Sequence, residues 1–234
     1  MGPEDDCDLV VDAMLAAGYD QEFCIGLDWS PLFISRLMKA GFLVMSETLT
    51  DEDEMGKLKQ DIVLPKLHLV RSALFFQNLH IKRSIKPFLS RYELRFDPDF
   101  ETIVNKCLAT HGQGWLTPSL VRSLFLLREQ PGRESPLLVP TEFPRPVSFG
   151  LYRNGELRAG ELGVICGRVY TSYSGYKEEN NAGTVQMILM AQALEEAGFA
   201  FLDFGMPLDY KTDLGARDIT PEEFVGLFRA AQKY

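Results

Sequence analysis

The chain has 234 residues, of which 46% are hydrophobic and 24% are charged, and its net charge is −9 at pH 7. This composition is typical of a globular protein with one large domain, or with a small domain joined to a larger one. The acidic balance excludes a general nucleic-acid coat protein, because attraction to phosphates needs a basic surface. No apolar stretch approaches the ~18 residues that a membrane span needs, so we expect no membrane partner.

In the N-terminal half the patterns of apolar and turn-forming residues predict short elements. They are, in chain order, a helix over 28–41, an exposed polar loop over 46–61, strands over 62–65 and 69–76, a short basic helix or turn over 79–91, a strand over 92–96, and helices over 97–112 and 117–132. The first helix has Ser30 as its cap, Pro31 at its first position and Gly41 at its end.

The C-terminal half has the clearer pattern. A loop with five prolines is expected over 131–146, followed by three strands whose turns lie at Asn154-Gly155 and at Gly167. After them the sequence predicts a helix over 180–198, a buried strand over 199–204, a loop, and a last helix with a capping box that begins at Thr220. This order suits a mixed α+β sheet of the N-acyltransferase (GNAT-like) type, in which two central strands splay apart to admit an acyl donor, although other α+β folds share it.

The cysteines and histidines bear on redox state and metal binding. Cys7, Cys24, Cys107 and Cys166 form no C-x-x-C pair and predict reduced, mostly buried thiols in a cytoplasmic protein. The three histidines lack metal-ligand spacing among themselves or with the cysteines, so we expect no metal site. The acidic N-terminal segment MGPEDDCDLV has neither the basic nor the apolar region of a signal peptide.

Several short stretches keep an order and spacing that together are specific. They are LDWSP (27–31), LHIKRSIK (79–86), GWLTP (114–118), YRNGELRAGELGV with GRVY, NNAG (180–183), FLDFG and LGARDIT. In these stretches the chain resembles the bacterial leucyl/phenylalanyl-tRNA–protein transferases, from about residue 25 to residue 232. The resemblance implies a small N-terminal α/β domain over 1–74 and a GNAT-like transferase domain over 75–234, with a mixed sheet and flanking helices.

The resemblance also implies an activity. The enzyme would move Leu, Phe or a related apolar amino acid from charged tRNA to acceptor proteins or peptides with an N-terminal Lys or Arg, which marks them for degradation. Its partners would be aminoacyl-tRNA and these acceptors, with no DNA and no cofactor. CoA is disfavoured, because the segment SYSGYKEENNAG carries Glu178 and Glu179 and lacks the glycine spacing that cradles a pyrophosphate. A CoA-dependent N-acyltransferase and a non-catalytic protein that binds tRNA or degrons remain alternatives.

Two residues are catalytic candidates. Asp203, at the end of the buried strand, matches the family's active-site aspartate and could orient or deprotonate the acceptor amine. The alternative is a structural Asp203 that caps a loop or pairs with Lys211 or Arg217. Tyr173 stands where the family has a glutamate, and we expect it to donate a hydrogen bond toward the ester unless it is a strand-edge aromatic. Gly205 replaces the family's catalytic glutamine.

Further residues are predicted to bind substrate. Trp115 matches a family tryptophan near the terminal adenosine, on which a base can stack, but it could also be a core residue. Asn181 and Thr184 begin a helix and could bind the donor or simply cap the helix. The segment AGFLVMS (40–46) stands where the family has an F-P-W run, so the floor of the donor site differs. The predicted substrate-binding set is Trp115, Ser174, Tyr176, Asn181, Thr184, Gly205 and Leu208.

A basic segment stands out against the acidic background. Within thirty residues that contain a single acid, Glu93, lie Lys66, Arg71, Lys82, Arg83, Lys86, Arg91 and Arg95. Lys82, Arg83 and Lys86 match the cluster with which the family grips the tRNA stem, because positive charge at these spacings forms one patch on a helical turn. The alternative is a solvated run of charge without a partner.

Overall fold

A computed structural model describes residues 1–53, 56–130, 135 and 137–233. The helices are α1 (Cys7–Ala16), α2 (Pro31–Lys39), α3 (Lys86–Leu89), α4 (Phe100–His111), α5 (Pro118–Arg128), α6 (Ala182–Glu196), α7 (Asp209–Asp213) and α8 (Pro221–Ala231), with a 3₁₀ turn η1 (Phe76–Asn78). The strands are β1 (Leu43–Asp53), β2 (Gly56–Lys66), β3 (Arg71–Leu74), β4 (Glu93–Phe96), β5 (Thr141–Arg153), β6 (Glu156–Gly167), β7 (Val169–Lys177), β8 (Phe201–Gly205) and β9 (Arg217–Ile219).

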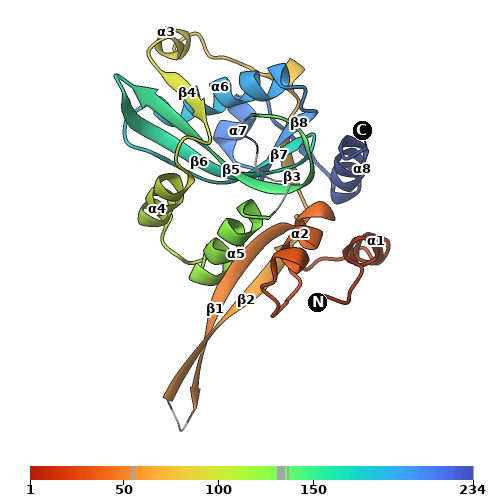
Figure 1. The fold of residues 1–234 in the computed structure, drawn as a ribbon. Coiled ribbons are helices and arrows are strands. Elements are labelled where there is room, and N and C mark those ends of the chain that lie inside the picture. The colour runs from red at the N-terminus through yellow and green to blue at the C-terminus, as the bar shows by residue number, and fades with distance from the viewer. Residues whose placement is uncertain (54–55, 131–134, 136, 234) are drawn as a thin grey trace.

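A seven-stranded mixed sheet forms the centre of the molecule (Figure 1), in the order β4-β5-β6-β7-β8-β3-β9. All neighbouring strands are antiparallel except β7 and β8, which are parallel. The predicted turns are confirmed: Asn154 and Gly155 have φ angles of 55° and 81°, and Gly167 has 58°. Such positive angles favour glycine and asparagine in tight hairpins. The prediction of a mixed α+β sheet with flanking helices is confirmed.

Helices cover both faces of this sheet. The helix α6 packs on one face, against β5, β6 and β7, whereas α4 packs on the other face of the same strands and α5 contacts β5. Alternation along β6 sends Leu162 and Val164 into the core beneath α4, and Ala159 and Ile165 into the core beneath α6. The core beneath α4 extends without a break into α1, α2 and β1, so the N-terminal segment is anchored on the sheet.

Two predicted N-terminal caps are confirmed, those at Ser30 and Thr220. The Ser30 Oγ accepts a hydrogen bond from the Phe33 N–H at 3.3 Å, and the Thr220 Oγ1 accepts one from the Glu223 N–H at 3.3 Å. Each bond satisfies an N–H group that has no partner inside its helix.

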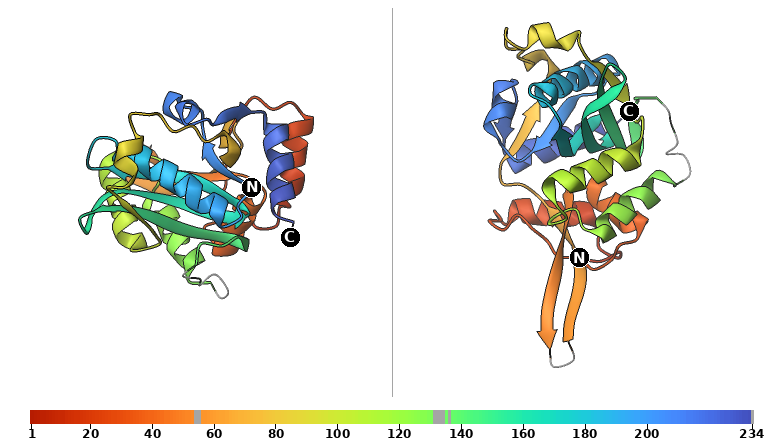
Figure 2. Two further views of the ribbon diagram at one scale, coloured as in Figure 1. Left: turned by 90° about the horizontal axis from the view of Figure 1, so that it is seen from above. Right: turned by 90° about the vertical axis from the view of Figure 1, so that its left-hand side faces the viewer.

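The expected loop over 46–61 is wrong. Strands β1 and β2 pair antiparallel from Leu43↔Lys66 to Asp53↔Gly56, and their outer half projects from the body as a two-stranded ribbon (Figure 2). Polar residues suit both faces of a ribbon that no other element covers, so this segment has the composition of a loop. Residues 54 and 55 lie outside the described part of the chain.

The expected loop over 131–146 is wrong in its last third, because β5 begins at Thr141. Proline is tolerated there since β4 pairs only with the stretch from Phe149 to Tyr152, which leaves the start of β5 at the edge of the sheet, and a register shift follows Thr141. Residues 131–134 and 136 of the expected loop lie outside the described residues. The helices α1 and α7 were not predicted.

The predicted domain boundary falls at residue 74. Residues 71–74 form β3, which lies inside the seven-stranded sheet between β8 and β9, although the prediction assigns them to the N-terminal domain. The division of the chain into 1–74 and 75–234 stays a prediction. All four cysteines are free thiols. Among the residues that the structure describes, no helix is both long and apolar enough to cross a membrane.

Candidate active site

Asp203 lies in β8 and is completely buried. The Arg71 Nε and Nη2 atoms donate to its two carboxylate oxygens at 2.9 and 2.6 Å, and the Thr171 hydroxyl and the Gly205 N–H donate at 2.9 Å each. Burial alone would raise the pKa of Asp203, but the Arg71 charge and these hydrogen bonds outweigh it and hold that pKa below its usual value. Asp203 is therefore a carboxylate whose oxygens are already engaged.

The alternative of an ion pair between Asp203 and Lys211 or Arg217 is wrong about the partner, because Asp203 pairs with Arg71. Lys211 donates instead to the Phe204 and Met206 carbonyls at 2.7 and 2.8 Å, and Arg217 pairs with Glu223. In this arrangement Asp203 has no free oxygen directed at a substrate, so a direct role in proton transfer stays a prediction. The geometry favours a positioning role, in which Asp203 fixes the end of β8.

Arg71 connects this ion pair to the N-terminal segment. Its Nη1 donates to the Gly41 carbonyl at 3.1 Å, and its guanidinium group lies 3.9 Å from the centroid of the Phe224 ring. Arg71 thus joins β3 and β8 to the end of α2 and to α8. Its burial removes it from the basic surface on which the sequence placed it.

Tyr173 and Trp115 come together at the base of the β1–β2 ribbon. Tyr173 is the extra residue of a bulge in β7, and its ring centroid lies 6.3 Å from that of Trp115. The Val44 N–H donates to the Tyr173 hydroxyl at 3.2 Å, while Ser46 donates its N–H and its hydroxyl to the Trp115 carbonyl. Burial raises the pKa of Tyr173, so its hydroxyl keeps its proton at neutral pH. The first residues of β1 therefore form one wall around both rings.

A small, partly enclosed pocket lies beside these residues. Arg71, Thr171 and Tyr173 line it together with an otherwise apolar set, Met38, Gly41, Phe42, Val164, Cys166 and Phe228. Its volume of about 10 Å³ leaves room for about one water molecule, so an amino-acid side chain would enter only if the pocket widened.

The two parallel strands diverge next to this pocket. The strands β7 and β8 pair only from Val169↔Phe201 to Thr171↔Asp203, whereas β7 continues to Lys177. Gly205, at the end of β8, has a φ angle of +70°, and a Cβ there would lie 3.8 Å from both His68 and Leu43. A side chain at this position would be strained, so the structure has no direct substitute for the family's glutamine.

His68 is a polar residue at this opening that the sequence did not single out. It is buried, its Nδ1 has no hydrogen-bond partner among the described residues, and burial lowers its pKa to about 3. The imidazole is therefore neutral at physiological pH and can accept or donate one further hydrogen bond. Its spacing from the other histidines and the cysteines does not match a metal site, and no other pattern in the sequence marks it.

The other predicted binding residues are dispersed around the sheet. Ser174 and Tyr176 are buried on β7, and the Tyr176 hydroxyl has no partner among the described residues. Asn181 precedes α6 in the left-handed conformation, without a capping hydrogen bond from its side chain, and Thr184 is half-buried in the first turn. Leu208 is 40% exposed. The structure therefore does not gather these five residues around the pocket.

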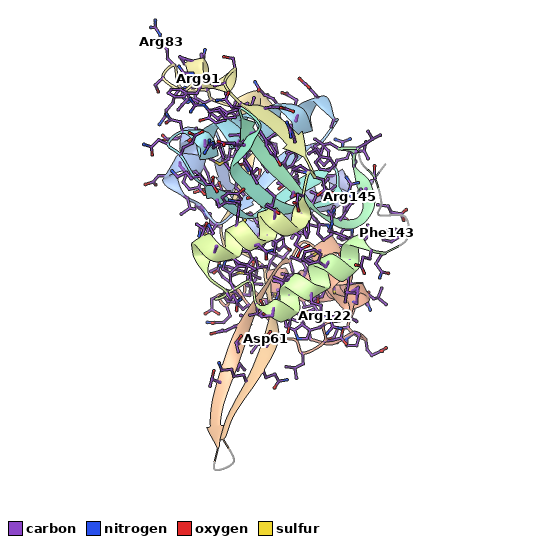
Figure 3. The ribbon with its side chains drawn as sticks, turned by 60° about the vertical axis from the view of Figure 1, so that its left-hand side comes forward. Asp61, Arg83, Arg91, Arg122, Phe143 and Arg145 are labelled. Atoms are coloured by element: carbon purple, nitrogen blue, oxygen red, sulfur yellow. The ribbon has the colours of Figure 1, made fainter. Side chains whose placement is uncertain are left out.

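The basic surface is smaller than the sequence suggested. Lys66 pairs with Glu22 at 3.0 Å on β2, and Arg71 is buried. Of the exposed cations that remain, Arg95 on β4 pairs with Glu93, and the other four lie around α3: Lys82, Arg83, Lys86 and Arg91. Figure 3 shows Arg83 and Arg91 at the end of the molecule opposite the β1–β2 ribbon.

Lys82 links this surface to the end of β8. Its ammonium group pairs with Asp213 of α7 at 2.6 Å, and both side chains are half exposed. The basic surface around α3 therefore borders the segment that follows the catalytic candidate Asp203.

The family model of the leucyl/phenylalanyl-tRNA protein transferases matches residues 73–229 of the chain. The chain belongs to this family. The family match begins within β3 and ends in α8, so it includes the seven-stranded sheet except Arg71 and Ser72, and it leaves the β1–β2 ribbon outside.

Individual relatives agree with this family. The chain is 31% identical to a leucyl/phenylalanyl-tRNA–protein transferase of Pseudomonas entomophila (strain L48) over 159 aligned residues. The alignment covers 66% of this chain and 65% of that relative. It is 24% identical to a leucyl/phenylalanyl-tRNA–protein transferase of Campylobacter jejuni (strain RM1221) over 200 aligned residues. That alignment covers 86% of this chain and 85% of the relative. The chain thus spans somewhat less than two thirds of the Pseudomonas relative.

Among solved structures, the C-terminal domain of a lysylphosphatidylglycerol synthetase from Agrobacterium fabrum aligns with 97% of this chain and 78% of that chain. The TM-score is 0.46 and the identity is 14%, which supports no conclusion about fold or function.

Proposed function

We propose that this chain is an aminoacyl-tRNA–protein transferase of the cytoplasm. It moves Leu, Phe or a related apolar amino acid from charged tRNA to the N-terminal Lys or Arg of acceptor proteins or peptides, and so marks them for degradation. The observation that carries the proposal is the family match over the seven-stranded sheet, apart from the first two residues of β3. The free cysteines agree with a reducing compartment.

The ester of an aminoacyl-tRNA is already activated, so the protein must mainly hold it beside the acceptor amine and stabilise the tetrahedral oxyanion. In the proposal the apolar pocket widens to receive the donor side chain, and Trp115 stacks on the terminal adenosine. The Tyr173 hydroxyl donates a hydrogen bond toward the ester. Asp203 acts as a positioning residue, because it holds the Gly205 N–H and the Thr171 hydroxyl at the point where β7 and β8 diverge.

The proposal includes a GNAT-like arrangement of the sheet, with 1–74 as a small N-terminal domain and 75–234 as the transferase domain. Its support is the parallel pair β7 and β8, whose pairing stops after three residues. The opening would admit the aminoacyl end of the tRNA where related folds admit an acyl donor.

The basic surface around α3 would grip the tRNA stem in this proposal. Arg83 and Lys86 are exposed, and Lys82 is only half covered by its ion pair with Asp213. Each phosphate contact made by such a cation contributes to the salt dependence of binding.

A transfer assay tests the proposed function. The chain is incubated with a mixture of charged tRNAs, each carrying a radiolabelled amino acid, and a peptide that begins with arginine. We expect label from leucyl- or phenylalanyl-tRNA on the peptide; no label from any charged tRNA would refute the proposal.

One observation favours a second candidate, a non-catalytic protein that binds tRNA or degrons. Asp203 is sealed in its ion pair with Arg71, and Gly205 offers no side chain to the reaction. This candidate predicts binding of charged tRNA or of the peptide without transfer of label.

A further inference from the structure

A buried lysine holds the backbone at the end of β8. Lys211, in α7, is 6% exposed, and its ammonium group donates to the Phe204 and Met206 carbonyls at 2.7 and 2.8 Å. The same group lies 5.8 Å from the centroids of the Phe204 and Tyr210 rings. In the described part of the chain no carboxylate is within ion-pair distance of it. Burying an ammonium group in this way costs stability, and charged groups buried at such a cost are frequent in functional sites.

The backbone that Lys211 holds lies at an irregular point of the sheet. Phe204 is the extra residue of a bulge in β8, because the register with β3 shifts there. The next residue, Gly205, has a φ angle of +70°, and glycine restricts its own backbone less than any other residue does. Met206 is 52% exposed, so packing does not fix the chain beyond β8. The two bonds from Lys211, together with the bond from the Gly205 N–H to the Asp203 carboxylate, therefore hold this turn in one conformation.

The helix α7 that carries Lys211 is itself fixed to the segment before α3. Lys82 of that segment pairs with Asp213 of α7. Gly215, just after α7, approaches the same segment so closely that a Cβ there would collide with the Asn78 carbonyl oxygen. Lys211 therefore connects the end of β8 to the segment that carries the predicted tRNA contacts.

We propose that Lys211 is a positioning residue of the transfer reaction, which fixes the backbone around Gly205 so that the acceptor amine is aligned with the ester. The inference rests on the proposed function, because it assigns a part in that same reaction. Gly205 has no side chain that could orient a substrate, so at this position only the backbone can do so. A displacement of about 1 Å can slow a reaction about 100-fold, so a backbone in this role has to be held in place. Lys211 acts through the Phe204 and Met206 carbonyls and not on the reacting atoms.

Single-turnover transfer separates this role from a purely structural one. Labelled leucyl- or phenylalanyl-tRNA and a peptide that begins with arginine are mixed with excess enzyme, at concentrations where doubling the enzyme leaves the rate constant unchanged. A smaller folded fraction then does not lower the rate constant. Lys211→Met removes the ammonium group and keeps an apolar stem, whereas Lys211→Gln keeps two N–H donors on a shorter stem.

Arg145→Met is the matched control. Arg145 is also a buried cation, 2% exposed, and its guanidinium group donates to the Ser135 and Leu137 carbonyls at 3.1 and 3.0 Å. It lies in β5, which β6 and β7 separate from β8. Arg145→Met and Lys211→Met each leave two backbone carbonyls without their donor, so both should lower the urea midpoint of unfolding.

We expect Lys211→Met to lower the rate constant of transfer about 10- to 100-fold with the Kd for charged tRNA unchanged. Lys211→Gln should lie between Lys211→Met and the wild type, and Arg145→Met should keep the wild-type rate constant. A rate constant within about twofold of the wild type in both Lys211 variants, or an equal decrease in Arg145→Met, would overturn the inference and leave the proposed function standing. Lys211 would then serve only the stability of the fold. No transfer of label by the wild type would refute the proposed function and this inference with it.

Discussion

Replacing Arg71 by methionine should strongly destabilise the protein, because Asp203 would remain buried without its cation. The ion pair is almost fully enclosed, with side-chain exposures of 2% for Arg71 and 0% for Asp203, and its two hydrogen bonds are parallel. Removing one partner of such a pair costs about 3–5 kcal/mol, since the remaining charge is uncompensated. The Gly205 N–H and the Thr171 hydroxyl still bind Asp203, so we expect the lower half of that range.

The loss should depend on pH with a defined sign. In the wild type the pKa of Asp203 is lowered on folding, so its stabilising contribution is present above the unfolded pKa and is lost as pH falls through the folded value. In Arg71→Met the buried carboxyl group is destabilising when ionised, so the penalty grows as pH rises above the unfolded pKa of about 4. The difference between the two proteins should therefore begin to grow at the lowered folded pKa of Asp203 and increase further toward neutral pH, so it should be larger at pH 7 than at pH 4.

Urea unfolding followed by circular dichroism, at pH 4 and pH 7, measures this difference. The double variant Arg71→Met/Asp203→Asn is the control, because it removes the uncompensated charge and should regain much of the stability at pH 7. A loss below about 1 kcal/mol at pH 7, or one that does not change with pH, would refute the assignment of Asp203 as a structurally paired carboxylate.

Two further substitutions test the donor side of the proposal. Arg83→Glu should weaken binding of charged tRNA and make that binding less dependent on salt. Filter binding at several salt concentrations measures this: in a plot of log binding constant against log salt concentration, the slope should fall in magnitude by about 1. An unchanged slope would remove Arg83 from the tRNA interface. Tyr173→Phe should lower the turnover number for transfer about 10²-fold with tRNA binding unchanged, as measured in single-turnover assays; unchanged turnover would exclude the hydroxyl from the reaction.

Local signals explain what the sequence could predict of the fold. The turn at Asn154-Gly155, the end of α6 before Gly198 and the N-terminal cap at Thr220 each depend on residues close in the chain, and the structure confirms them. The β1–β2 ribbon lacks such signals, because its outer half buries no face and its polar residues resemble a loop. Its existence depends on pairing along the whole length of two strands.

The site depends on contacts that the sequence cannot show. Arg71 and Asp203 are 132 residues apart, and the basic segment offered several cations as candidates for a surface patch and none as a core partner. Trp115 and Tyr173 were both predicted, but only the fold shows that the first residues of β1 enclose them.

Intact mass spectrometry of an acceptor peptide tests the central claim most directly. The peptide begins with arginine and is incubated with the chain, a mixture of charged tRNAs and acetyl-CoA together, so that both donor classes compete in one reaction. The account predicts a gain of one leucyl or phenylalanyl residue at the peptide's N-terminus and no acetyl group. An acetylated peptide, or an unchanged peptide with every charged tRNA, would contradict it.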